Sequence, residues 1–157
     1  MTNGRQVKCI INQTIGVNNI ELILIDDAST DHTPDIIKTC EQKYPDMIIA
    51  IFNKENLKQG TCRNIALDYY ASGEYFCFID SDDIVPPYYL EYLYNTAIHN
   101  HTDVIQLNFS YDINNIPVSS DALTYNTFIC DTVEKRKQLI IGHEYLDESC
   151  TCKFILK

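Results

Sequence analysis

The chain has 157 residues, of which 45% are hydrophobic and 22% charged, and its formal net charge is −10. This size and composition fit one soluble globular domain with a sizeable core. The negative charge argues against a basic surface for nucleic acid or anionic lipid, so an acidic ligand would need a metal ion as a bridge. No apolar run reaches the roughly 18 residues that a membrane-spanning helix needs. With a polar start at Met1–Lys8, we expect a cytoplasmic protein.

Helical and strand-like patterns alternate along the first 111 residues. The expected helices are Arg5–Thr14, Thr33–Tyr44, Thr61–Gly73 and Pro87–Asn100, and the expected strands are Glu21–Asp27, Met47–Phe52, the apolar start of Glu74–Val85, and Asp103–Tyr111. The unbroken apolar run of Glu21–Asp27 is typical of a parallel strand buried on both faces. Strands that alternate with helices predict an α/β fold with a parallel, Rossmann-like sheet. Further along, Thr132–Ile141 suggests a helix and Cys150–Leu156 a last strand, all within one domain of residues 1–157.

Carboxylates end the third apolar run at Asp80, Asp82 and Asp83. Asp80 and Asp82 are two residues apart, so both can face one side of an extended or tightly turned segment and share a hard divalent cation. The ends of strands in open α/β sheets are where ligands bind. The alternative is a solvated turn in which Ser81 or Asp83 caps the next helix.

Other polar positions leave two interpretations open. Ser29 follows a strand-ending carboxylate pair, but Ser29 to Thr33 are also typical of a turn and a helix start. Arg63 lies in the first turn of a predicted helix, where the helix dipole opposes it, so it is tied to a carboxylate or directed at an anionic ligand. Asp27, at the end of a strand, is expected to be solvated and to contribute little to stability. The seven cysteines are scattered and odd in number, which indicates small core residues rather than disulfides.

Several short motifs then follow one another in a fixed order. They are Asn12-Gln13-Thr14, Ile-Asp-Asp-Ala-Ser-Thr-Asp at 25–31, Asn56 with Gly60, Arg63-Asn64, Ala-Ser-Gly-Glu-Tyr-Phe at 71–76, Phe-Ile-Asp-Ser-Asp-Asp at 78–83, and Pro87 with Leu90-Glu91. In this order they resemble family 2 glycosyltransferases of the GT-A fold. The resemblance implies a mostly parallel central sheet with helices on both faces. It also implies transfer of a sugar, with inversion, from a UDP-sugar to a saccharide or lipid-linked acceptor in polysaccharide synthesis, in the cytoplasm or at the inner membrane face.

The resemblance also assigns residues to a site. The nucleotide-sugar-binding residues that it implies are Asp26, Asp27, Ser29, Arg63, Asp80 and Ser81, and the metal ligands are Asp82 and Asp80. Asp26 and Asp27 would hold the uracil and ribose, and Asp82 would bind the Mn²⁺ or Mg²⁺ that bridges the diphosphate. A cation there neutralises the charge of the leaving group, which an acidic pocket alone would repel.

Three departures from the family pattern stand out. The family's usual first strand has no counterpart before Arg5, and its general base is expected beyond Lys153, so the chain resembles a domain truncated at both ends. The catalytic base is therefore unassigned, and Glu144, Asp147 and Glu148 do not fit its pattern. Ala28 replaces a family glycine, which is tolerated unless the turn needs a positive φ there.

Two alternatives to an active transferase remain. One is an inactive fragment that folds or binds a partner without turnover. The other is a phosphatase of the haloacid dehalogenase type, with Asp80 as nucleophile and Asp82 as acid. Metal-dependent binding of a sugar nucleotide would separate the transferase from the phosphatase, and turnover would separate it from the inactive fragment.

Overall fold

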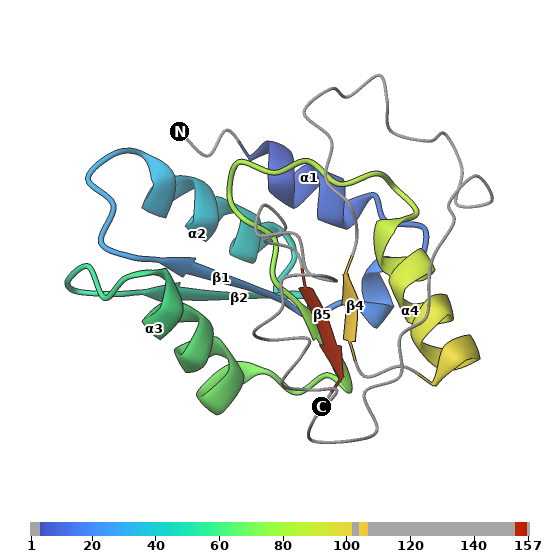
Figure 1. Ribbon diagram of the computed structural model, residues 1–157. Coiled ribbons are helices and arrows are strands. Elements are labelled where there is room, and N and C mark those ends of the chain that lie inside the picture. Colours follow the sequence, from blue (N-terminus) through green and yellow to red (C-terminus); the bar gives the residue numbers. More distant parts are fainter. Residues whose placement is uncertain (1–3, 102–103, 107–152, 157) are drawn as a thin grey trace, which may run out of the picture.

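The structure is a computed structural model and describes residues 4–101, 104–106 and 153–156. Its first half is built on a parallel strand pair, β1 (Leu22–Asp26) and β2 (Ile48–Phe52), connected by α2 (Thr33–Lys43). The register runs from Leu22 opposite Ile48 to Asp26 opposite Phe52. In Figure 1, α2 lies on one side of this pair and α3 (Gln59–Ile65) on the other. Helices thus cover both faces, as the alternating pattern predicts.

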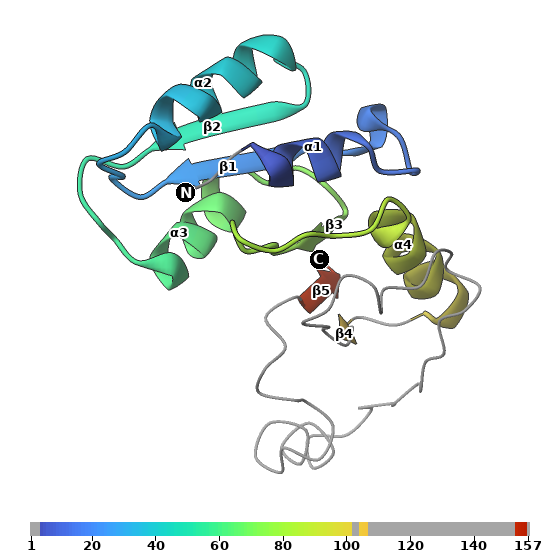
Figure 2. The same cartoon turned by 90° about the horizontal axis from the view of Figure 1, so that it is seen from above.

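A second, three-stranded sheet brings distant parts of the chain together. β5 (Lys153–Leu156) lies between β3 (Tyr75–Cys77) and β4 (Val104–Gln106) and is antiparallel to both. Figure 2 shows this sheet beside α4 (Tyr89–Asn100) and apart from the β1–β2 pair. Because β5 comes from the expected run Cys150–Leu156, the strand itself is confirmed, and the sheet that it joins is antiparallel.

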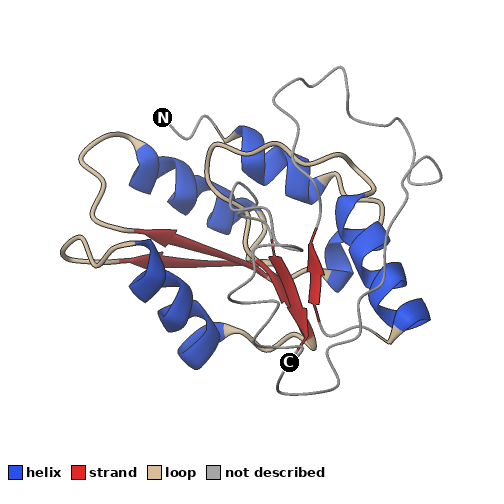
Figure 3. Cartoon of the chain, in the orientation of Figure 1, coloured by secondary structure: helices blue, strands red, loops and turns tan. Residues whose placement is uncertain are grey.

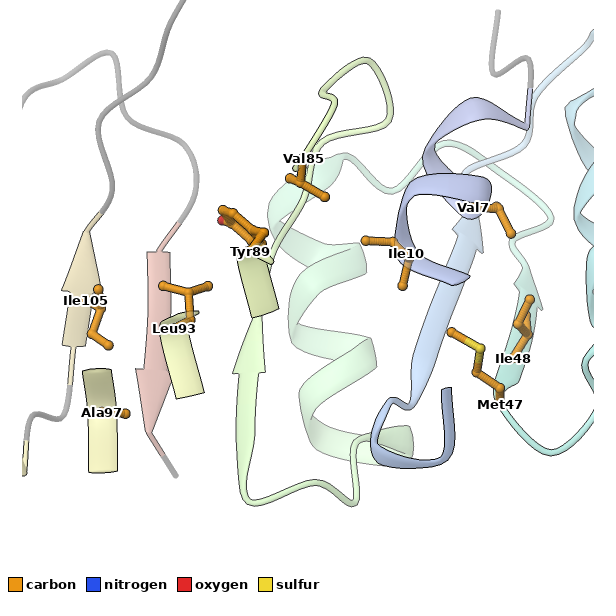
Figure 4. Close-up of a cluster of buried hydrophobic side chains, with 9 residues drawn as sticks. All are labelled: Val7, Ile10, Met47, Ile48, Val85, Tyr89, Leu93, Ala97 and Ile105. Carbon is orange, nitrogen blue, oxygen red and sulfur yellow. The ribbon is translucent and has the colours of Figure 1, made fainter. Parts of the chain in front are cut away.

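The hydrophobic core joins the two halves. α1 (Arg5–Ile11) and α4 contribute most of its buried side chains, and Figure 4 shows Val85 between Tyr89 of α4 and Ile10 of α1. The buried cluster consists of Val7, Ile10, Met47, Ile48, Val85, Tyr89, Leu93, Ala97 and Ile105. Val85, which follows the acidic turn of residues 80–83, is therefore buried in this core. Its burial holds the chain in place directly after the turn.

Several boundaries differ from those expected. α1 ends at Ile11, three residues early, because the chain turns through a short 3₁₀ segment, η1 (Val17–Asn19), after Gly16 with φ 87°. α2 begins at Thr33, so the N-cap position belongs to His32 and not to Thr33, and Asp31 Oδ1 accepts from the Thr33 N–H at 2.9 Å.

The strands are also shorter and less buried than expected. Only Tyr75–Cys77 of the third apolar run is a strand, since its pairing with β5 covers three residues. The apolar residues of β1 are half-buried rather than buried on both faces. In the described ranges β1 pairs with β2 alone, which leaves less of its surface covered.

Some expectations fall on residues that the structure does not describe. These are the helix at Thr132–Ile141, most of the strand at Asp103–Tyr111, and Glu144, Asp147 and Glu148. The four cysteines of the described part, Cys9, Cys40, Cys62 and Cys77, are free thiols that are buried or half-buried, as expected. None of the helices in the described ranges is long and apolar enough to cross a membrane.

Candidate active site

The loop of residues 53–58, after β2, is organised around the carboxylate of Asp27, which follows β1. Oδ1 of Asp27 accepts hydrogen bonds from Asn53 Nδ2 and Leu57 N, both at 2.8 Å, and Oδ2 accepts one from Lys58 N at 2.9 Å. The loops after β1 and β2 leave the same edge of the strand pair (Figure 3). A single carboxylate at that edge therefore sets the path of the 53–58 loop.

These contacts change the chemistry of Asp27. They lower the pKa of its carboxyl below the ordinary 3.8, chiefly through the Leu57 N–H and then the Asn53 amide, because hydrogen bonds favour the charged form. The expectation of a solvated Asp27 is wrong, since its donors come from a loop about thirty positions away in sequence. The Cys62 thiol also hydrogen-bonds this carboxylate and lowers its pKa further.

Asp26 and Ala28 flank this residue in unusual environments. Asp26 is 4% exposed; its Oδ2 accepts from Ser29 N at 3.3 Å, and its Oδ1 is buried without a hydrogen-bond donor among the described residues. Ala28 has φ 60°, in the left-handed region that a side chain disfavours. The turn therefore does need a positive φ where the family has glycine, and this chain tolerates alanine there under strain.

The second group of site residues surrounds Asp80. Its Oδ1 accepts from Arg63 Nη2 at 2.7 Å and from Gln59 Nε2 at 2.8 Å. The Arg63 guanidinium also lies over the Phe78 ring, 4.9 Å from its centroid. The sequence left open whether Arg63 pairs with a carboxylate or is directed at an anionic ligand, and the structure shows that it pairs with the carboxylate of Asp80. The ion pair is partly exposed and contributes little to stability, so its main effect is to hold both side chains in place.

Two consecutive residues connect the two groups. Lys58 donates its N–H to Asp27, and Gln59 donates its side-chain amide to Asp80. Lys58 has φ 73° and ψ 155°, a backbone conformation that a non-glycine residue rarely adopts and that tends to occur at functional sites. The strand-end carboxylates after β1 and β3 therefore belong to one hydrogen-bonded site.

The turn after Asp80 presents Asp82 to solvent. Asp83 N donates to Asp80 O at 3.1 Å, and the side chains of Ser81 and Asp82 are exposed. Within the described ranges, neither Asp82 nor Oδ2 of Asp80 has a side-chain hydrogen bond or an ion pair. These two carboxylates supply the hard oxygen ligands that a divalent cation prefers.

The described residues include no group of three or more His, Cys, Asp and Glu side chains that could hold a metal. Mg²⁺ is usually bound through one or two carboxylates together with substrate phosphates and water. The pair Asp80 and Asp82 therefore fits a cation that takes its other ligands from a bound diphosphate.

The structure corrects the position of Arg63 and adds partners that the sequence did not indicate. α3 begins at Gln59, two residues before the expected start, so Arg63 lies in its last turn and not its first. The helix then continues as a π-helical turn, η2 (Ala66–Tyr70), in which Ala71 N donates to Ala66 O. Asn53 could have been found as a polar residue that ends a strand, whereas nothing in the sequence marked Gln59.

The α/β fold is that of a GT-A-type transferase. The chain belongs to glycosyl transferase family 2, whose sequence model matches residues 4–157. The resemblance drawn from the motifs is thereby confirmed. Family membership removes the phosphatase alternative.

Three relatives illustrate the match. The minor teichoic acid biosynthesis protein GgaB of Bacillus subtilis (strain 168) is 46% identical over 79 residues, which cover 50% of this chain and 9% of GgaB. S. aureus TarS 1–349 in complex with UDP has a TM-score of 0.60 and 25% identity over 72% of this chain and 33% of that one.

The third is the mannosyltransferase PcManGT from Pyrobaculum calidifontis in complex with GDP-Man and Mn²⁺. It has a TM-score of 0.50 and 26% identity over 54% of this chain and 25% of that one. The chain thus spans about a third or less of the length of each of these relatives.

Proposed function

We propose that this chain is the nucleotide-sugar-binding part of a glycosyltransferase that moves a sugar from a UDP-sugar to a saccharide or lipid-linked acceptor, with inversion and with the help of Mn²⁺ or Mg²⁺. The observation that carries the proposal is the link through Lys58 and Gln59, which joins Asp27 to Asp80 in one site. Ligand sites of open α/β sheets lie at this edge, outside the C-terminal ends of the strands. The GgaB likeness supports a cell-envelope polymer as the acceptor.

The two carboxylate groups would bind opposite ends of the nucleotide. Among the described residues Asp26 has a buried oxygen without a donor, and Asp27 is the adjacent carboxylate, so the pair suits the N–H and O–H donors of uracil and ribose. UDP is the nucleotide in the TarS structure, whose TM-score of 0.60 exceeds the 0.50 of the GDP-Man complex, and this supports uridine. Ser29, whose N–H is held by Asp26, would line the same end.

The diphosphate end would lie at Asp80, Ser81 and Asp82. A divalent cation bound there neutralises the charge that develops on the diphosphate as the bond to the sugar breaks. Arg63 would remain beside Asp80 as a fixed cation, because Phe78 and Asp80 both hold its guanidinium in place. The Mn²⁺ in the mannosyltransferase structure supports the metal part of the proposal. An inverting transfer also needs a general base, which stays a prediction.

Binding is tested by thermal unfolding with UDP, Mn²⁺, both, or UDP with a chelator. UDP and Mn²⁺ together should raise the melting temperature more than the sum of the separate shifts, because each supplies ligands to the other. Asp82→Asn should remove the extra shift, and the matched surface variant Asp46→Asn should keep it. An equal shift from UDP with chelator and with Mn²⁺ would refute the metal part, and an equal shift from GDP would refute the choice of uridine.

Turnover is a separate measurement. Release of UDP from a panel of UDP-sugars, with and without oligosaccharide acceptors, distinguishes a transferase from the inactive alternative. We expect Asp82→Asn to abolish any acceptor-dependent release. A protein that binds UDP with Mn²⁺ but releases none with any acceptor would support the inactive alternative.

A further inference from the structure

Gln13 is a buried polar residue that the proposed function leaves without a role. Its side chain is 4% exposed and has three hydrogen bonds, all to backbone atoms. Nε2 donates to Cys9 O at 3.1 Å and to Pro86 O at 2.8 Å, and Oε1 accepts from Leu90 N at 2.9 Å. Two of these partners lie more than seventy residues further along the chain, on either side of the start of α4. A buried amide so completely paired fixes the local geometry.

Two partners of Gln13, Pro86 and Leu90, follow the acidic turn of residues 80–83. At the other end, Arg63 and Gln59 hold Asp80. After the turn, Val85 is buried in the core, and the next two residues are held by Gln13 and by Thr14, whose N–H donates to Pro87 O at 2.8 Å. The backbone that carries Asp82 is therefore held on both sides, at Asp80 before it and at Pro86 after it.

Between these points the chain has three exposed residues. Ser81 and Asp82 are exposed, and Ile84 is 45% exposed. A backbone hydrogen bond within the turn runs from Asp83 N to Asp80 O at 3.1 Å. The direction of the Asp82 carboxylate thus depends on where the chain is held at Asp80 and at Pro86.

We propose that Gln13 is a positioning residue for the Asp82 carboxylate: by holding Pro86 O and Leu90 N, it sets the geometry with which the turn meets a metal–diphosphate ligand. The inference rests on the proposed function, since it concerns the same metal site. Residues that orient a metal ligand from behind typically change metal affinity by 10–100-fold when removed. Because Gln13 acts through backbone four residues away from Asp82, we expect the lower end, a loss of about tenfold.

The variant for the test is Gln13→Met, which keeps the side-chain length and removes the donor and the acceptor. UDP affinity is measured by calorimetry with Mn²⁺ and with chelator, and direct Mn²⁺ binding by electron paramagnetic resonance. Gln13→Met should weaken UDP binding about tenfold in Mn²⁺ and less than about twofold in chelator. In an Asp82→Asn background, Gln13→Met should cause no further loss, because the ligand that it positions is already gone.

Matched controls separate positioning from general destabilisation. Ile10→Val and Ile10→Ala change a residue of α1 three positions before Gln13, which is equally buried and belongs to the same core cluster as Val85 but forms no side-chain hydrogen bond. Both should lower the melting temperature and leave the Mn²⁺-dependent UDP affinity within about twofold, since they do not release Pro86. If Gln13→Met fails to fold, Gln13→Asn serves instead, because its shorter amide cannot hold Pro86 O and Leu90 N together.

The outcomes are distinguishable. A wild-type protein without any Mn²⁺-dependent UDP binding would overturn the proposed function itself. If the wild-type protein shows this binding but Gln13→Met keeps it, or loses affinity equally in Mn²⁺ and chelator, the positioning role is overturned. An Ile10 variant with the same metal-specific loss would overturn it as well.

Discussion

Replacing Ala28 by glycine should stabilise this protein, although glycine usually destabilises. Ala28 has φ 60°, where the side chain crowds the backbone at a cost of about 1–2 kcal/mol. Glycine removes that crowding but loses about 0.5–1 kcal/mol more conformational entropy than alanine on folding. The difference predicts that Ala28→Gly raises the free energy of unfolding by about 0.5–1 kcal/mol.

Ala71 provides the matched control. It is also half-buried, but its φ of −67° and ψ of 122° are ordinary for alanine. Ala71→Gly should therefore lower the free energy of unfolding by about 0.5–1 kcal/mol, through the entropy of the unfolded chain alone. Urea unfolding of both variants and the wild type, with m-values compared, gives the two changes directly.

The contrast in sign is the test. For a domain of this size, each kcal/mol corresponds to about 2–4 °C in melting temperature, so thermal unfolding should show Ala28→Gly above the wild type and Ala71→Gly below it. If Ala28→Gly destabilises as much as Ala71→Gly, the left-handed turn after Asp27 stores no strain and the reasoning is refuted.

Two further predictions concern the carboxylates. The pKa of Asp27 is lowered chiefly by the Leu57 N–H, and that of Asp31 by the Thr33 hydroxyl and N–H, so their stabilisation is present above the ordinary 3.8 and is lost as pH falls through the lower folded values. Urea midpoints should drop from about pH 5 downward, less steeply in Asp31→Asn, and an unchanged slope would contradict this. Asp27→Ala should release the 53–58 loop and speed tryptic cleavage at Lys54 and Lys58, whereas the exposed control Asp46→Ala should not; equal cleavage rates would show that Asp27 does not hold the loop.

The sequence by itself determined the class of fold and the family. The apolar runs at Glu21–Asp27 and Met47–Phe52 became β1 and β2 with ends shifted by at most one residue, because short apolar runs that alternate with amphipathic helices are typical of strands. The ordered motifs then identified the family. The local hydrophobic pattern and the order of the motifs suffice for the class of fold and the family, because both can be read directly from the sequence.

Only the tertiary structure decided how the site is held together. Asp27 accepts hydrogen bonds from the 53–58 loop, and Asp80 accepts one from Gln59 as well as one from Arg63. The local sequence pattern reveals neither set of donors. The buried amide of Gln13 likewise joins residues more than seventy positions apart. Hydrogen bonds between distant segments depend on the path of the whole chain, so they carry no periodic signal in the sequence from which they could be predicted.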